Sequence, residues 1–205
     1  IGHLAMGNAY ADTVLPPLTG GDKTLRIQAG HEPVALTSEL FNIAFPYSQD
    51  AERQASLVSR MLSVRLREQL REAAGGVYSL RFGIRLDRER QQAYGLLSYS
   101  HEPGRGDELQ QLAQKVINKA LLEGFTQQEL DEIKQQISSS LQPEMLTSSH
   151  RFSWLSDNAS DNELQPMPAD YLYWLDNVSL PELDALSRAI LSDPNVIDAR
   201  LTPKA

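Results

Sequence analysis

One stretch of the chain changes from helical to strand periodicity within a few residues, and this change restricts the possible folds more than any other feature. Across 48–72, apolar residues recur three and four positions apart, which predicts a long amphipathic helix. Across 77–86, apolar and polar residues alternate, which predicts a half-buried strand with Tyr78 and Leu80 on its apolar face. Gly75 lies between the two patterns and is expected to end the helix, because glycine accepts the backbone geometry of helix C-termini. The chain is therefore expected to pack a helix against a sheet.

The same periodicity test predicts the remaining elements and the fold class. The order β-β-α-β-β-α-α-α-α-α-β predicts an α+β fold, in which a mostly antiparallel sheet of about five strands carries helices on one face. The strand of 77–86 and one at 92–100 are expected to form an antiparallel hairpin. We expect 1–23 to be a connector or tail and 24–205 to be a single domain. The other expected strands are 24–28, 39–47 and 195–201, and the other expected helices are about 106–124, 126–142, 145–157, 168–176 and 179–191.

Several helix boundaries carry capping signals. Ser48 is a candidate N-cap, and Gly124 is expected to close a helix. Thr126 and Glu129 have the S/T-x-x-E spacing of a capping box, in which the two side chains satisfy free backbone donors reciprocally. Pro143 is expected to end the helix that this box begins, because proline lacks the N–H that a helix interior needs.

Charge and composition exclude several classes of partner. The formal net charge is −8, and the 19 Lys and Arg residues are spread along the chain, whereas nucleic-acid binding needs a basic patch. No apolar run reaches the ~20 residues that span a bilayer, so a membrane partner is not expected. The chain has no cysteine, which excludes disulfides and thiolate metal sites. It lacks an initiator Met and a signal-peptide pattern, so we interpret it as an internal fragment of a longer protein.

The sequence also lacks a constellation that could hold a metal or activate a nucleophile. A hydrolytic zinc site needs about three converging protein ligands, but no two of the four histidines lie four residues apart, and there is no H-x-x-E-H. We therefore expect no metal site in this chain and interpret the histidines as isolated surface or loop residues. They are His3, His31, His101 and His150.

The segment at the change of periodicity resembles a known signature. Arg71-Glu72-Ala73-Ala74-Gly75-Gly76-Val77-Tyr78 fits R-E-x-x-G-x-x-Y without a gap. This pattern is similar to the one in the C-terminal, zinc-free half of insulinase/pitrilysin-family (inverzincin) zinc metallopeptidases, and a bacterial member of the family is favoured. The resemblance extends over roughly 24–202 through the following hairpin, the paired helices and the final strand. It implies a fold like that of the mitochondrial-processing-peptidase domains.

The resemblance also implies a function. In that family, zinc and H-x-x-E-H lie on the N-terminal half, and the C-terminal half closes a proteolytic chamber over them. By position, Arg71 and Tyr78 would contact the peptide substrate, and Gly75 would form the structural turn. A guanidinium or phenol donor placed outside the zinc shell can stabilise the oxyanion of peptide hydrolysis. This fragment alone is expected to bind no zinc and to cleave nothing.

The implied partners are peptide substrate and a zinc-bearing N-terminal half, on the same protein or on a partner chain. The cofactor implied for the full-length enzyme is zinc. The periplasm and the cytoplasm both stay open as the compartment, and the periplasm is favoured.

Ordinary interpretations stand beside this one. Arg71 suits any last helical turn through the helix dipole, and Tyr78 could be a tyrosine at the edge of the core. The same fold serves as a noncatalytic structural or assembly module in relatives, which is the alternative function. A separate peptide-binding module would rest on aromatic residues late in the chain, for which packing between helices is the favoured interpretation. These aromatics are Phe152, Trp154, Tyr171, Tyr173 and Trp174.

Overall fold

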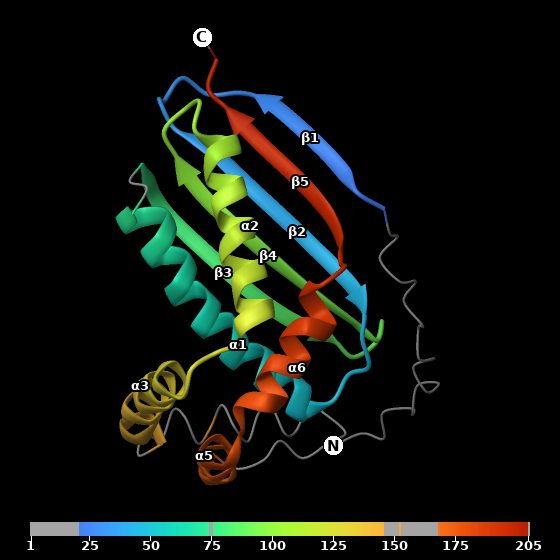
Figure 1. Ribbon diagram of the computed structural model, residues 1–205, viewed down its shortest axis with the longest axis vertical. Coiled ribbons are helices and arrows are strands. Elements are labelled where there is room, and N and C mark those ends of the chain that lie inside the picture. Colours follow the sequence, from blue (N-terminus) through green and yellow to red (C-terminus); the bar gives the residue numbers. More distant parts are fainter. Residues whose placement is uncertain (1–20, 74–75, 146–151, 153–167, 205) are drawn as a thin grey trace, which may run out of the picture.

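The computed structural model describes residues 21–73, 76–145, 152 and 168–204. A five-stranded sheet carries helices on one face, as Figure 1 shows for α1, α2 and α6. The α+β fold expected from the sequence is therefore confirmed. In chain order the elements are β1 (Lys23–Gln28), β2 (Ala35–Ala44), α1 (Gln49–Arg67), the π-helix η1 (Glu68–Ala73), β3 (Val77–Asp87), β4 (Gln92–His101), α2 (Gly106–Glu123), α3 (Gln127–Met145), α5 (Pro168–Asn177), α6 (Leu180–Leu191) and β5 (Asn195–Thr202).

The strand order in the sheet is β1-β5-β2-β4-β3. β3 and β4 form the expected antiparallel hairpin, and β2 pairs antiparallel with both β4 and β5. β1 pairs parallel with β5, so the first and last described strands lie side by side at one edge. β3 forms the other edge, and α1 packs along it.

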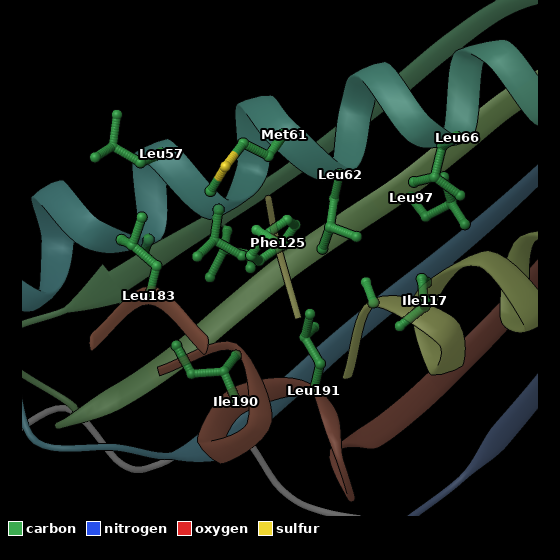
Figure 2. Packing of buried hydrophobic residues seen from close by; sticks show 14 of the residues in the cluster. Leu57, Met61, Leu62, Leu66, Leu97, Ile117, Phe125, Leu183, Ile190 and Leu191 are labelled. Carbon is green, nitrogen blue, oxygen red and sulfur yellow. The ribbon is translucent and has the colours of Figure 1, made fainter. Parts of the chain in front are cut away.

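The core fills the space between the sheet and the helices. Figure 2 shows side chains of α1, α2 and α6 meeting those of β4 and of the α2–α3 connection. Removing a buried leucine from such a site costs about 2–5 kcal/mol, because the cavity does not collapse fully. Residues that contribute to it and are fully buried include Leu57, Leu62, Leu66, Leu97, Leu109, Leu130, Leu183 and Ile190.

The capping signals hold the helix ends as expected. Ser48 accepts a hydrogen bond from the Ala51 N–H at 3.0 Å and caps α1. The Glu129 carboxylate accepts from the Thr126 N–H at 2.7 Å, and the Thr126 hydroxyl accepts from the Glu129 N–H at 3.2 Å. Gly124 ends α2 with a φ of 78°. These local patterns could be read from the sequence because their partners lie within three residues of one another.

Several boundaries differ from the expectations. β2 begins at Ala35 instead of 39, because its first residues pair with β4 although they are not strongly apolar. α3 continues through Pro143 to Met145. The helix expected at 145–157 and most of the connector at 1–23 lie outside the described residues. None of the helices that the structure describes combines the length and the hydropathy needed to cross a membrane.

Candidate functional site

The end of the first long helix places Arg71 on the surface. α1 does not continue as an α-helix to residue 72; it passes into the π-helix η1 at Glu68. Single π-turns within helices are rare and recur at functional sites, because the wider turn changes which side chains face outward. In η1, Leu70 stays fully buried while Arg71 is exposed. Within the described part of the chain, Arg71 forms no hydrogen bond or ion pair, so its guanidinium is available to a ligand.

Tyr78 lies at a β-bulge and projects away from the core. Val77 pairs with His101 and Ser79 pairs with Ser100, so Tyr78 is the extra residue between them. Val77 is buried, whereas the Tyr78 side chain is 59% exposed. The expectation that Tyr78 shares the apolar face of Leu80 is therefore wrong. A bulge breaks the alternation on which that expectation depended.

A glycine does form the turn between Arg71 and Tyr78, but the described one is Gly76. Gly75, the expected turn residue, lies outside the described residues. Gly76 has a φ of 73°, in the left-handed region that side chains disfavour. A Cβ atom there would also lie 2.4 Å from the Arg105 guanidinium. Its carbonyl accepts a hydrogen bond from the Glu102 N–H at 3.1 Å, which fixes the entry into β3. The Gly75-Gly76 dipeptide is the sequence signal that indicates a turn at this position.

The sheet face opposite the described helices is partly apolar. Leu40 is 45% exposed, and Leu96 and Ile197 pair with it on the neighbouring strands. Adjacent exposed apolar side chains of this kind are typical of contact surfaces. On β3, the strand that carries Tyr78, the residues on the same face are polar and basic instead of apolar. One row across the sheet runs Leu25, Ala199, Ser38, Ser98, Arg81, and the next runs Lys23, Ile197, Leu40, Leu96, Gly83.

A groove of about 400 Å³ runs between α1, the β3 edge and α3. Hydrogen bonds between side chains of α1 and backbone groups of β3 fix the two walls of the groove. The Ser63 hydroxyl donates to the Phe82 carbonyl at 3.2 Å, and the Ile84 N–H donates to the Ser59 hydroxyl at 2.8 Å. The Leu86 N–H donates to the Glu52 carboxylate at 2.7 Å. α1 and β3 therefore run antiparallel along the groove.

A partly buried polar cluster lies between the sheet and α2. Burial raises the pKa of Glu39 on β2. A hydrogen bond from Gln110 lowers this pKa, but the effect of burial is larger. Arg200 on β5 donates to Asp107 at 2.6 Å and to Gln110 at 2.8 Å. Burial also raises the pKa of Tyr99 on β4. This cluster ties α2 to the sheet beneath it.

The described residues do not fit a zinc site. They hold no group of three or more His, Asp or Glu side chains placed to bind a metal ion. His31 is exposed, as expected of a loop histidine, but His101 is 1% exposed and therefore not a surface residue. Its ring bonds to the Thr37 hydroxyl at 2.9 Å and to the Glu102 carbonyl at 2.9 Å. His3 and His150 lie outside the described residues.

Two of the three aromatic residues of α5 pack against another helix. Tyr171 and Trp174 of α5 stack with ring centroids 5.6 Å apart, and the Arg53 guanidinium of α1 lies over both rings. The Trp174 indole N–H of α5 donates to the Asp50 carboxylate of α1. Tyr173 is 75% exposed. The aromatic pair therefore joins α5 to α1, in agreement with the packing interpretation. Phe152 is exposed, and Trp154 lies outside the described residues.

Comparison with known proteins gives relatives for this arrangement. The chain is 30% identical over 129 residues to the probable zinc protease PqqL of Escherichia coli (strain K12), which is 61% of this chain and 14% of that protein. The crystal structure of the periplasmic protease PqqL from Escherichia coli matches with a TM-score of 0.81 at 23% identity, over 91% of this chain and 21% of that one. The chain therefore spans about a fifth of the length of this relative.

Two further structures share the fold. The ferredoxin protease FusC, solved in complex with Arabidopsis ferredoxin, matches with a TM-score of 0.72 at 22% identity, over 91% of this chain and 21% of that one. The first half of PqqL from Escherichia coli matches with a TM-score of 0.71 at 10% identity, over 91% of this chain and 43% of that half.

The family assignment agrees with these relatives. Residues 13–137, well over half of the chain, match the family described as the Peptidase M16 inactive domain. The resemblance to the zinc-free domain of zinc peptidases is thereby confirmed, and this chain belongs to the Peptidase M16 inactive domain family.

Proposed function

We propose that this chain closes the proteolytic chamber of a zinc endopeptidase and contacts the peptide substrate through Arg71 and Tyr78. The observation that carries the proposal is the exposure of both side chains on either side of one turn. Arg71 lies in the last turn of η1, Tyr78 lies at a bulge at the start of β3, and η1 contacts β3. A guanidinium and a phenol held on ordered elements can donate hydrogen bonds to a substrate carbonyl or to the oxyanion that forms from it.

In this proposal the zinc-bearing half lies elsewhere in the parent protein or on a partner chain. Two observations support this division. The described residues hold no metal-binding group, and the domain family is described as inactive. The first half of PqqL also has this fold, so a similar domain is a reasonable partner. The open sheet face and Tyr78 would then face the chamber, and the compartment would be the periplasm, as for PqqL.

The test is peptide hydrolysis by the parent protein. Arg71→Ala is expected to lower kcat/KM by about 10²-fold and Tyr78→Phe by about tenfold, as loss of oxyanion donors does. Arg188→Ala, an exposed arginine in the last turn of α6, and Tyr173→Phe, an exposed hydroxyl on α5, are the matched controls and should leave the rate unchanged. Normal rates for both site variants would show the assignment of Arg71 and Tyr78 to be wrong.

The alternative, a noncatalytic assembly module of the same fold, predicts a different parent. An H-x-x-E-H in the rest of the parent sequence and one bound zinc per parent molecule support the peptidase. A parent that lacks both would favour the assembly module.

A further inference from the structure

Exposed arginines form a band along α1, η1 and β3. Arg60, Arg67 and Arg71 are spaced seven and four residues apart, so they share one side of the helix, and all three are exposed. The positions three and four residues from Arg60 and Arg67 carry no acidic residue, although helical arginines are commonly balanced there. Within the described part of the chain, the guanidinium groups of Arg60 and Arg67 have no ion-pair partner.

The strand opposite adds two more positive charges. Arg81 and Arg85 are exposed on β3, and their partners across the β3–β4 ladder are Ser98 and Tyr94, which are uncharged. Arg85 makes a solvent-exposed ion pair with Glu52 at 3.3 Å. Such a solvent-exposed pair contributes little to stability, so it leaves the guanidinium able to exchange partners.

The groove between α1 and β3 lies within this band. Its lining includes Arg60, Arg67 and Arg85 together with the serines of α1, and no carboxylate. Because α1 and β3 are antiparallel, Arg85 lies toward the Arg60 end, and Arg81 lies toward the end at which Arg71 and Tyr78 are found. The groove therefore leads toward the proposed substrate contact.

A local positive band is notable in a chain whose net charge is −8. That overall charge repels a long polyanion such as a nucleic acid, whereas a short anionic segment meets only the local field. From Arg60 to Arg71 the helix rises about 16 Å, at about 1.5 Å per residue. An extended peptide covers that distance with about five residues, at about 3.3 Å each.

We propose that this groove binds a short acidic segment of the peptide substrate, with carboxylates paired to Arg60, Arg67 and Arg85, next to the residues that contact Arg71 and Tyr78. The inference rests on the proposed function and specifies the substrate class, namely peptides with glutamate or aspartate within about five residues of the contacted bond.

A binding experiment with the 205-residue chain tests this without any catalysis. The probes are two fluorescein-labelled hexapeptides that differ only in having glutamate or glutamine, measured by anisotropy. The glutamate peptide is expected to bind about tenfold more tightly at low salt, the sum of two or three exposed ion pairs. High salt should remove the difference.

Variants locate the binding. Arg60→Gln with Arg67→Gln should abolish the preference for glutamate. Lys115→Gln with Lys119→Gln removes the same charge from exposed positions of α2 and should retain it. Equal binding of the two peptides by the wild-type chain would overturn the inference, as would an unchanged preference in the Arg60/Arg67 variant. Tighter binding of a polyphosphate or an oligonucleotide of equal charge, lost in the same variant, would assign the groove to phosphate and also overturn it.

The parent protein supplies a second measurement. If it cleaves peptides, substrates with glutamate near the contacted bond should have a KM about tenfold lower than their glutamine counterparts, with kcat unchanged. Cleavage without this preference would contradict the acidic groove but not the peptidase. A glutamate preference in binding with no cleavage by the parent would contradict the peptidase but not the groove.

Discussion

Glu129 shows how one side chain can join three elements. Its carboxylate accepts hydrogen bonds from Arg65 of α1 at 2.7 Å and from the Thr126 hydroxyl at 2.8 Å. Arg65 also donates to the Gly124 carbonyl at 2.9 Å, at the end of α2. Burial alone would raise the pKa of Glu129, but the bonds from Arg65 and Thr126 outweigh burial and lower it to about 2.

Glu129→Gln should therefore destabilise the domain in a pH-dependent way. A carboxyl with a lowered folded-state pKa contributes stability above its ordinary pKa of 4.5 and loses it as the pH falls toward about 2. At pH 7 the variant should lose about 2 kcal/mol of unfolding free energy, the usual contribution of charge-assisted hydrogen bonds. Denaturant unfolding across this pH range measures the effect, and the gap from wild type should close in acid.

The matched control is Glu132→Gln, one turn further along α3. The Glu132 side chain makes a surface hydrogen bond with Gln128 at 2.9 Å. This substitution should change stability by less than about 0.5 kcal/mol. An equal loss in both variants would mean that the Arg65–Glu129 contact does not matter.

At this scale the sequence predicted local partners but not distant ones. The bond between Thr126 and Glu129 follows from a three-residue spacing. The Arg65–Glu129 pair joins residues 64 positions apart and depends on how α3 docks on α1. The directions of the Arg71 and Tyr78 side chains could not be predicted from the sequence either. A π-turn and a β-bulge each change the direction of a side chain, and neither leaves a clear signal in the pattern of apolar residues.

Among the elements, the turn into β3 sets the position of Tyr78. Gly76 combines a positive φ with a close guanidinium, whereas Gly104 has a φ of 91° and open space around its Cβ position. Substitution of Gly104 therefore tests backbone strain alone, whereas substitution of Gly76 tests backbone strain together with a steric contact.

Gly104→Ala should destabilise the fold by about 1–2 kcal/mol, the cost of a side chain in the left-handed region. Gly76→Ala should cost more, because Arg105 must also move, and it should lower peptidase activity of the parent by displacing Tyr78. Thermal unfolding of both variants and a rate measurement test this. Similar stability and normal activity for the two would show that the turn does not position Tyr78.

The periodicity of the sequence predicted most elements because their apolar faces meet one core. The exceptions have physical causes. The first residues of β2 are held by ladder bonds to β4 and β5, and a central strand keeps this pairing whatever its polarity. Leu70 is fully buried within the π-helix η1, so its four-residue spacing from Leu66 looks like that of an ordinary helix.

At the scale of the whole molecule, one face of the sheet carries none of the described helices. Leu40 and Leu96 are neighbours on adjacent strands and are both exposed. Sequence alternation showed only that each strand has two faces. Whether both faces are covered depends on where the helices dock, which local patterns do not encode.

The isolated chain is therefore expected to bind a hydrophobic dye and to self-associate through this face. Leu40→Ser with Leu96→Ser should reduce both, because two adjacent apolar side chains are removed from the patch. Leu122→Ser is the control, since Leu122 is 85% exposed on α2, away from the sheet. Dye fluorescence and sedimentation velocity measure the outcome. If the Leu122 variant had the larger effect, the face would not be the contact surface.

The position of β5 has a consequence for synthesis on the ribosome. β5 is inserted between β1 and β2, and the pairing of β1 in the described sheet is with β5. β1 emerges first but cannot join the sheet until the last strand has been translated, about 10–30 s later at the usual elongation rates. During that interval β2, β3 and β4 can assemble while the side of β2 that later pairs with β5 is open. A nascent chain is thus exposed to pairing errors at that side, and a holding chaperone would act there.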